Sequence, residues 1–322
     1  MPPVNPLLEL CVEKSVSYLA SDAALVSLDQ DPYWPKWCSP WWHMMLLWEL
    51  NFASRIPSRT IEQLVQKMDE HYLKFFPFRL EEIPAGADPV RHILCHCALG
   101  CAHQLLFDYG VDVDARLPWV REWYFRYQLE DGALNCDEQA YTTTRRGSIV
   151  STVPPLEAIL HCSNRGFSDE EIAFLDRGAH YLLERKLIRS RQTDQLIDKS
   201  WLNLCFPRFY HYDMLRGLNY VFDWALKLKR KIALSSFEEC VARIDAAFPD
   251  TLVSVGRRCW SDSNSSWYDP EKSEWYKAPA GTFALLELVG EPGSFSADLT
   301  RLWSEARKKA RLLLELDLLD AD

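Results

Sequence analysis

The sequence predicts an all-α protein in which five or six helical hairpins form an α/α toroid. One pattern recurs five times: a loop rich in aromatic residues, Pro, Gly or Cys leads into an apolar helix. Copies recur at intervals of roughly 50 to 70 residues, which fit one hairpin with its loops. Strand patterns are scarce, and hairpins that cannot bury their apolar faces alone pack into stacked or closed arrays. The copies begin near Trp41, Cys95, Ser148, Tyr210 and Ala280.

The helices between these copies are more polar and have recognisable starts or apolar faces. Residues 60–73 begin with Thr60 at the expected N-cap and carry Gln63 at the third helical position, which indicates a capping box. Residues 168–185 open with Ser-Asp-Glu-Glu, a strong helix start. Further amphipathic helices are expected from Leu7 and over 235–248 and 300–318, whereas the short apolar run 251–255 is expected to be a connector. Each polar outer helix then pairs with an apolar inner helix.

Parallel inner helices would place their N-termini at one end of the toroid. These ends carry unpaired backbone N–H groups and a partial positive charge. The long loops 131–147 and 260–278 would gather at the same end. We therefore expect a ligand pocket at this mouth. Its candidate lining residues are His43, Cys95, His96, Ser148, Ser151, His211, Tyr212, Asp213 and Thr282.

The composition narrows the class of protein. The 322 residues are long enough for a sizeable core, and we expect one domain over residues 1–322. A net charge of −10 argues against nucleic-acid binding. We expect no transmembrane helix, since no apolar stretch is long enough, and no signal peptide. Ten cysteines in such a chain indicate free thiols and a cytoplasmic location.

Aromatic residues make up 13% of the chain, and they either fill wide spaces between helices or line a cavity for an apolar or cationic ligand. A cluster of Trp residues with one His, at 34–43, fits either role. The candidate substrate-binding residues are Trp41, Trp42, His43, His96, Ser151 and Tyr212.

Two sets of residues are candidate metal ligands. Cys136, Asp137 and His211 would offer sulfur, oxygen and nitrogen with an open fourth position, as in a catalytic zinc site. The competing interpretation is a turn at Cys136 and a hydrogen-bonded histidine. The second set is the helix start Cys95-His96-Cys97, followed by Cys101 and His103. These five residues lie on two helix faces, so they cannot all bind one ion.

Two segments resemble a known superfamily. YQLEDGALNC, at 127–136, resembles the Q-x-x-D-G repeat of squalene–hopene cyclases and of protein prenyltransferase β-subunits, which share an α/α toroid. FPRFYHYDMLRGLNYV, at 206–221, resembles the prenyltransferase segment with a zinc-binding His in a Tyr-His pair. The resemblance implies that His211 holds a zinc ion and that the ligand is an isoprenoid or a similar apolar molecule.

The chain also departs from both families. Residues 146–151 lack the Asp and Cys that prenyltransferases place two apart, and Asp112-Val113-Asp114-Ala115 lacks the last acid of the cyclase D-x-D-D motif. Candidate catalytic residues are His211, Asp213 and Asp131, where Asp213 is a general acid or a helix cap.

Two other functions remain open. One is a non-catalytic helical binding scaffold on the same fold. The other is a carbohydrate-active α/α-barrel enzyme, which would need Asp131 and Asp213 to face one cavity.

Overall fold

The computed structural model describes residues 6–261 and 263–320, which are predominantly helical, as the predicted all-α class requires. The helices are α1 (Pro6–Leu19), α2 (Asp22–Gln30), α3 (Pro40–Glu49), α4 (Ser58–His71), α5 (His96–Tyr109), α6 (Val113–Arg116), α7 (Trp119–Arg126), α8 (Gln139–Thr142), α9 (Ile149–His161), α10 (Asp169–Leu183), α11 (Met214–Leu228), α12 (Glu238–Ala247), α13 (Ala284–Val289) and α14 (Ala297–Glu315). Short strands are β1 (Ile232–Ala233), β2 (Asn264–Asp269), β3 (Glu274–Pro279) and β4 (Leu319–Asp320). None of the described helices is long and apolar enough to cross a membrane.

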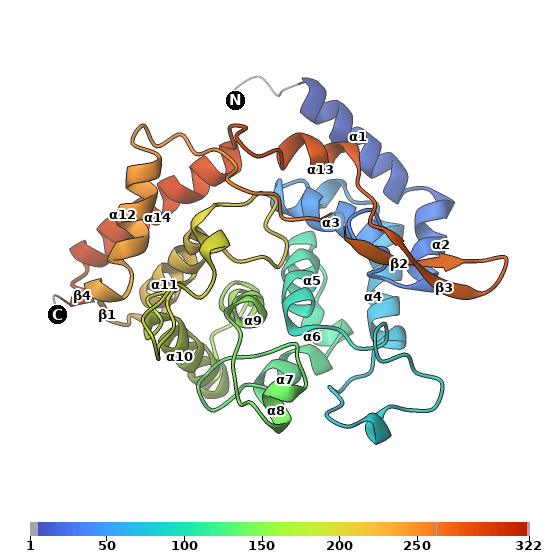
Figure 1. The fold of residues 1–322 in the computed structure, drawn as a ribbon, viewed down its shortest axis with the longest axis horizontal. Helices are drawn as coiled ribbons and strands as arrows, with labels where there is room; N and C mark the ends of the chain where they lie inside the picture. Colours follow the sequence, from blue (N-terminus) through green and yellow to red (C-terminus); the bar gives the residue numbers. More distant parts are fainter. Residues whose placement is uncertain (1–5, 262, 321–322) are drawn as a thin grey trace.

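Two kinds of helix occur, as the sequence predicts. Helix α5 buries every residue from His96 to Leu106, and α9 buries every residue from Ser151 to Leu160, so both are interior helices. By contrast, α4 buries only one stripe, which runs from Thr60 to Met68. Figure 1 shows α5 and α9 in the middle of the molecule, with α1, α2, α4, α10, α12 and α14 around them.

Helices α5 and α9 pack closely because a glycine faces the backbone of the other helix. A Cβ atom on Gly100 would lie 2.4 Å from the carbonyl carbon of Pro154, closer than any side chain can come. Gln104, one turn further along α5, donates from its side-chain nitrogen to the carbonyl oxygen of Pro154 at 3.2 Å. The centre of the fold is therefore fixed by backbone contact as well as by apolar burial.

Two of the predicted helix caps are present, and a third differs from the prediction. Ser168 forms the expected capping box with Glu171, and Asp213 caps α11 by accepting from the backbone N–H of Arg216 at 2.9 Å. Thr60 was the predicted cap of α4, but the helix already begins at Ser58. The Thr60 hydroxyl is buried and donates to the carbonyl oxygen of Leu19 at 2.7 Å, which satisfies the end of α1 instead.

Aromatic contacts join the N-terminal ends of several interior helices. Trp42, at the start of α3, lies 5.1 Å from Phe209 between ring centroids, and Phe209 precedes α11. His43 stacks on Phe283, just before α13, with a centroid distance of 3.7 Å. The backbone N–H of Cys136 donates to the Ser151 hydroxyl at the start of α9. Loops that precede different helices therefore meet at these helix starts.

The loop 260–278, expected to lack secondary structure, contains an antiparallel hairpin of β2 and β3. Trp267 pairs with Tyr276, and Tyr268 pairs with Trp275 across the strands. Aromatic cross-strand pairs stabilise two-stranded hairpins, which explains this departure from a helical pattern. The Asp269 side chain accepts from the backbone N–H groups of Glu271 and Lys272 in the turn. In Figure 1 the hairpin extends at the right edge.

Candidate functional site

Three cysteine thiols cluster at the start of α5. The sulfur atoms of Cys95, Cys97 and Cys136 all lie within 4.8 Å of one another, and those of Cys97 and Cys136 are 3.7 Å apart. In the described residues, this is the one group of three or more His, Cys, Asp or Glu side chains close enough to share a metal ion. We call these three residues the cysteine trio.

The trio combines one helix start with one loop. Cys95 is the N-cap residue of α5, and Cys97 lies in its first turn. Cys136 lies in the loop before α8, where its backbone N–H donates to the Ser151 hydroxyl at 3.2 Å. The N-terminus of a helix carries a partial positive charge, which favours negatively charged groups such as thiolates.

His96 lies between the two helix cysteines but points into the core, where it is fully buried. Its Nδ1 accepts from the indole N–H of Trp123 at 2.7 Å, so its Nε2 carries the proton and donates to the Tyr141 hydroxyl at 3.0 Å. The Tyr141 hydroxyl in turn donates to the carbonyl oxygen of Asn135 at 2.9 Å. Both ring nitrogens are therefore occupied, and burial lowers the pKa of His96 to about 4. His96 holds the Cys136 loop against α5 and has no nitrogen left for a metal ion.

Hydrogen bonds within the trio shift the pKa values of its thiols in opposite directions. The hydrogen bond with Cys95, and to a smaller extent the one with Cys97, lowers the pKa of Cys136 well below its ordinary value. The same contacts with Cys136 raise the pKa of both Cys95 and Cys97. The trio therefore releases its first proton readily and holds the other two more firmly.

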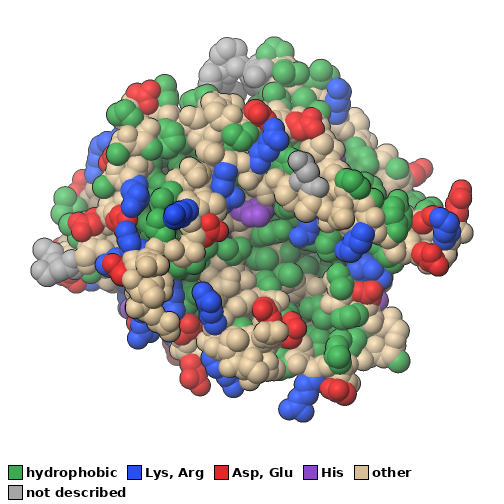
Figure 2. Space-filling model, viewed as in Figure 1, with side chains coloured by type: hydrophobic (Ala, Val, Ile, Leu, Met, Phe, Trp, Pro, Cys, Tyr) green, Lys and Arg blue, Asp and Glu red, His purple; other side chains and the backbone are tan. Residues whose placement is uncertain are grey.

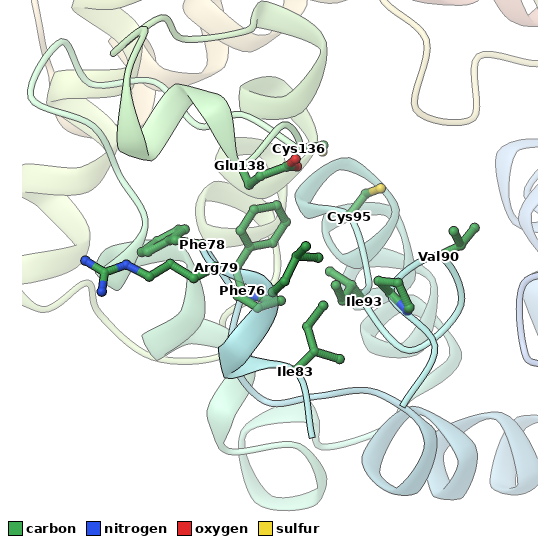
Figure 3. Close-up of a pocket in the computed structure, with 12 residues that line it drawn as sticks. Phe76, Phe78, Arg79, Ile83, Val90, Ile93, Cys95, Cys136 and Glu138 are labelled. Carbon is green, nitrogen blue, oxygen red and sulfur yellow. The ribbon is translucent and has the colours of Figure 1, made fainter. Parts of the chain in front are cut away.

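A pocket of about 290 Å³ opens beside the trio. Cys95 and Cys136 line one end of it, together with Glu138. In Figure 3 the Phe76 ring points toward this end, whereas the Arg79 side chain extends away from the pocket. The remaining lining residues are mostly apolar: Pro77, Phe78, Leu80, Ile83, Pro89, Val90 and Ile93.

The pocket wall is fixed to the same contacts that hold the trio. Phe76 stacks on His96 at 5.5 Å between ring centroids, and Phe78 stacks on Tyr141 at 5.2 Å. The backbone N–H of Phe76 donates to the Tyr127 hydroxyl at 2.9 Å. The segment between α4 and α5 is therefore anchored against the loop that carries Cys136.

A lysine surrounded by aromatic rings lies near the trio. The ammonium group of Lys36 lies between 5.4 and 6.0 Å from the ring centroids of Tyr33, Trp34, Trp37 and Tyr210. Burial lowers the pKa of Lys36, while the nearby thiols of Cys95 and Cys97 act in the opposite direction. A positive group therefore faces the trio from the loop before α3.

Most of the predicted substrate-binding residues are parts of the core. Trp41, Trp42 and Tyr212 are at most 1% exposed, and the Tyr212 hydroxyl donates to the carbonyl oxygen of Leu187. His43 is 6% exposed and stacked on Phe283, and burial lowers its pKa to about 3. Ser151 is the one of this set that contacts a trio residue directly through its hydroxyl.

The structure separates the predicted metal ligands Cys136, Asp137 and His211. Asp137 is exposed, and its carboxylate accepts from the backbone N–H of Gln139 in a turn. The ring of His211 stacks on that of Trp37 with 6.0 Å between the ring centroids. Its Nε2 is buried without a hydrogen-bond partner. Burial lowers the pKa of His211 to about 3. Cys136 instead joins the competing set, where His96 does not contribute a ligand atom.

The predicted carboxylates have structural partners. Asp213 is fully buried and accepts from the backbone N–H groups of Cys205 and Arg216. Asp131 is half-buried and faces Arg185 at 3.4 Å. Asp112, in the incomplete acid motif, caps α6 by accepting from the backbone N–H of Ala115. These carboxylates are engaged in capping and pairing.

Figure 2 shows the molecule in the orientation of Figure 1. A hollow lies near the middle of the face seen in Figure 2, with a mostly hydrophobic floor and Lys and Arg side chains around its edge. Fold and site together define a mostly helical protein with clustered thiols beside an apolar pocket. No protein-family model matches the chain, and comparisons with curated proteins and with solved structures give no match either.

Sequence reasoning missed the pocket wall and the aromatic surroundings of Lys36. The wall comes from the Phe-Phe-Pro-Phe run at 75–78, which follows α4 and fits no helical pattern. An apolar run in a long loop was the available signal, because loops seldom carry several aromatic residues unless these are covered. For Lys36, the signal was a lysine within a Trp-rich segment.

Proposed function

We propose that the protein binds one zinc ion through Cys95, Cys97 and Cys136 and holds a small apolar ligand, such as an isoprenoid, beside it. The observation that carries this proposal is that two cysteines of a three-thiol cluster line a pocket whose other side chains are mostly apolar. An ion held by three protein ligands keeps an open fourth position, as catalytic zinc sites do. That position would face the pocket.

The geometry of the trio fits zinc. With Zn–S bonds of about 2.3 Å, two sulfur ligands of a tetrahedral ion lie about 3.8 Å apart. The sulfur atoms of Cys97 and Cys136 are already 3.7 Å apart. Three thiolates on a divalent ion leave a net charge of about −1, which the helix start and Lys36 would both stabilise.

The residues around the zinc ion would determine which ligand it acts on. Zinc polarises a bound group or holds it as a nucleophile. The apolar wall of Phe76, Phe78 and Ile83 would exclude water and hold a hydrocarbon chain. The pocket volume lies near the lower end of the range for small-molecule sites, which favours a short ligand.

We further propose that the helices form an α/α toroid related to those of cyclases and prenyltransferases. The contacts among helix starts support this arrangement, because a toroid collects the N-termini of its inner helices at one end. The Q-x-x-D-G segment ends at Cys136, which the structure places in the trio. The carbohydrate-active alternative has less support, since Asp213 is buried and engaged by backbone N–H groups.

Elemental analysis of the purified protein tests the metal. We expect one zinc ion per chain, lost in separate Cys95→Ser, Cys97→Ser and Cys136→Ser variants. Cys162→Ser is the control, because Cys162 is a free, buried thiol like Cys97 but lies outside the trio. Full zinc content in all three trio variants would refute the assignment.

The ligand is tested separately with farnesol as the probe, by calorimetry. Ile83→Asp, in the pocket wall, should abolish binding, and Val26→Asp, on the exposed face of α2, should not. Equal farnesol binding by both variants would place the ligand elsewhere, and the zinc result would still stand.

A further inference from the structure

The three thiols of the trio differ in their access to the pocket, and zinc binding does not require this difference. Cys95 and Cys136 line the pocket, whereas Cys97 is 8% exposed and does not. The sulfur of Cys97 nevertheless lies 3.7 Å from that of Cys136. Two thiols, those of Cys95 and Cys136, therefore face an incoming molecule, and the third lies beside Cys136.

Only a short movement separates the sulfur atoms of Cys97 and Cys136 from bonding distance. A disulfide bond needs a separation of about 2.05 Å, so the sulfurs must approach by roughly 1.6 Å. Cys97 is fixed in the first turn of α5, but Cys136 lies in a loop before the short helix α8. Rotation of the Cys136 side chain supplies most of the movement while its backbone N–H stays on Ser151.

We propose that the metal-free trio is a dithiol centre that reduces small, uncharged disulfides. The Cys136 thiolate attacks one sulfur of the substrate disulfide, forms a mixed disulfide and releases the other half as a thiolate, which takes up a proton. The Cys97 thiol then loses its proton and attacks the sulfur of Cys136. This second step forms the Cys97–Cys136 disulfide and releases the remaining half as a thiol. The substrate gains two electrons from the protein and two protons, one from the Cys97 thiol and one from the solvent.

The pocket sets the class of disulfide. Its lining residues are mostly apolar, and the carboxylate of Glu138 lies at the same end as the two pocket-lining cysteines (Figure 3). A carboxylate there repels a negatively charged substrate, and the chain as a whole carries a charge of −10. The centre should therefore prefer neutral bis(2-hydroxyethyl) disulfide to oxidised glutathione.

The experiment uses full-length protein treated with a chelator and mixed with bis(2-hydroxyethyl) disulfide. We expect two small thiols released per chain and a Cys97–Cys136 linkage in non-reducing peptide mass spectrometry. In Cys97→Ser, one thiol should be released, and the adduct should persist on Cys136. In Cys136→Ser the rate of thiol release should fall at least about tenfold. Cys240→Ser removes a buried thiol outside the trio and should behave as the unsubstituted protein.

Three outcomes would overturn the proposal. One is a stable adduct on Cys136 while Cys97 is intact, and another is a Cys95–Cys136 linkage in place of the expected one. The third is equal rates with oxidised glutathione. Saturating zinc should slow the reaction if both activities share the trio. A protein that binds no zinc but forms the Cys97–Cys136 linkage would refute the metal proposal and leave this one intact.

Discussion

The hydroxyl of Tyr141 lies 3.0 Å from Nε2 of His96, and this contact joins the loop that carries Cys136 to the helix that carries Cys95 and Cys97. The same hydroxyl accepts from the backbone N–H of Asn135 and donates to its carbonyl oxygen. One phenol therefore holds Asn135, the residue next to Cys136, at two points and joins it to His96. The geometry of the trio depends on a residue that is not itself part of it.

Tyr141→Phe tests this dependence. Removing the hydroxyl frees the Cys136 loop, so zinc affinity should fall by about 10- to 100-fold, the usual effect of losing an outer-shell partner. Competition with a chromogenic chelator measures the affinity. Tyr276→Phe, on the exposed strand β3, is the control. Unchanged affinity in Tyr141→Phe would show that the loop is held by other contacts.

Gly100→Ala should destabilise the protein by about 1–3 kcal/mol or more, because overpacking forces the surrounding structure to move. Its new methyl group would meet the Pro154 carbonyl carbon at 2.4 Å, and backbone cannot give way easily. Gly166→Ala is the control, since nothing lies within 4 Å of that position. Urea unfolding of both variants checks the difference. Equal free energies of unfolding would contradict close packing of α5 and α9.

The buried pair of Arg216 and Glu157 gives a third prediction. Nε of Arg216 lies 2.9 Å from one oxygen of Glu157, and its NH2 nitrogen lies 2.6 Å from the other. Burial raises the pKa of Glu157, but Arg216 outweighs it and the net pKa is lowered. Glu157→Ala leaves a buried charge unpaired and should cost about 3–5 kcal/mol. Thermal unfolding measures this loss. Adding Arg216→Met to the Glu157→Ala variant should recover part of the lost stability.

His103 predicts a dependence of stability on pH. Its ring is 1% exposed, neither nitrogen has a hydrogen-bond partner, and burial lowers its pKa to about 3. The unfolded chain takes up this proton near pH 6.5, whereas the folded chain does not. Stability is therefore lost as the pH falls below about 6.5, by at most about 1.4 kcal/mol per pH unit for this residue.

His103→Leu removes that contribution, and urea unfolding between about pH 7 and pH 4 measures the slope. The free energy of unfolding of the variant should fall less steeply with decreasing pH than that of the unsubstituted protein. Parallel curves for the two proteins would mean that His103 is hydrated in the folded state.

The sequence predicted the helical class well because apolar periodicity and caps such as Ser168 act locally. It also identified Cys136 and Cys97 separately as candidate ligands. It did not pair them, because they lie 39 positions apart and meet only through the folding of a loop. Asp137 is adjacent to Cys136 in the sequence and was predicted as its partner, yet its carboxylate is used by its own turn.

Trp41, Trp42 and Tyr212 show a second difficulty. An aromatic residue at a helix start has the same sequence signature whether it lines a cavity or fills the core. Burial decides between the two, and burial depends on neighbours that are remote in the chain: Trp42 contacts Phe209, and the Tyr212 hydroxyl fills the space beside Gly217. Local periodicity carries no information about such neighbours.

The backbone N–H of Lys36 donates to the hydroxyl of Ser265 in strand β2 at 2.6 Å, across 229 positions of the chain. During synthesis, an early segment must therefore wait for most of the polypeptide to leave the ribosome before it finds its partner. Until then its tryptophans stay uncovered, and exposed aromatic surface invites association with chaperones or with other nascent chains. Ribosomes stalled before the hairpin emerges should carry chains that proteases cut near Trp34, and stalling only after the whole hairpin has left the ribosome should remove this sensitivity.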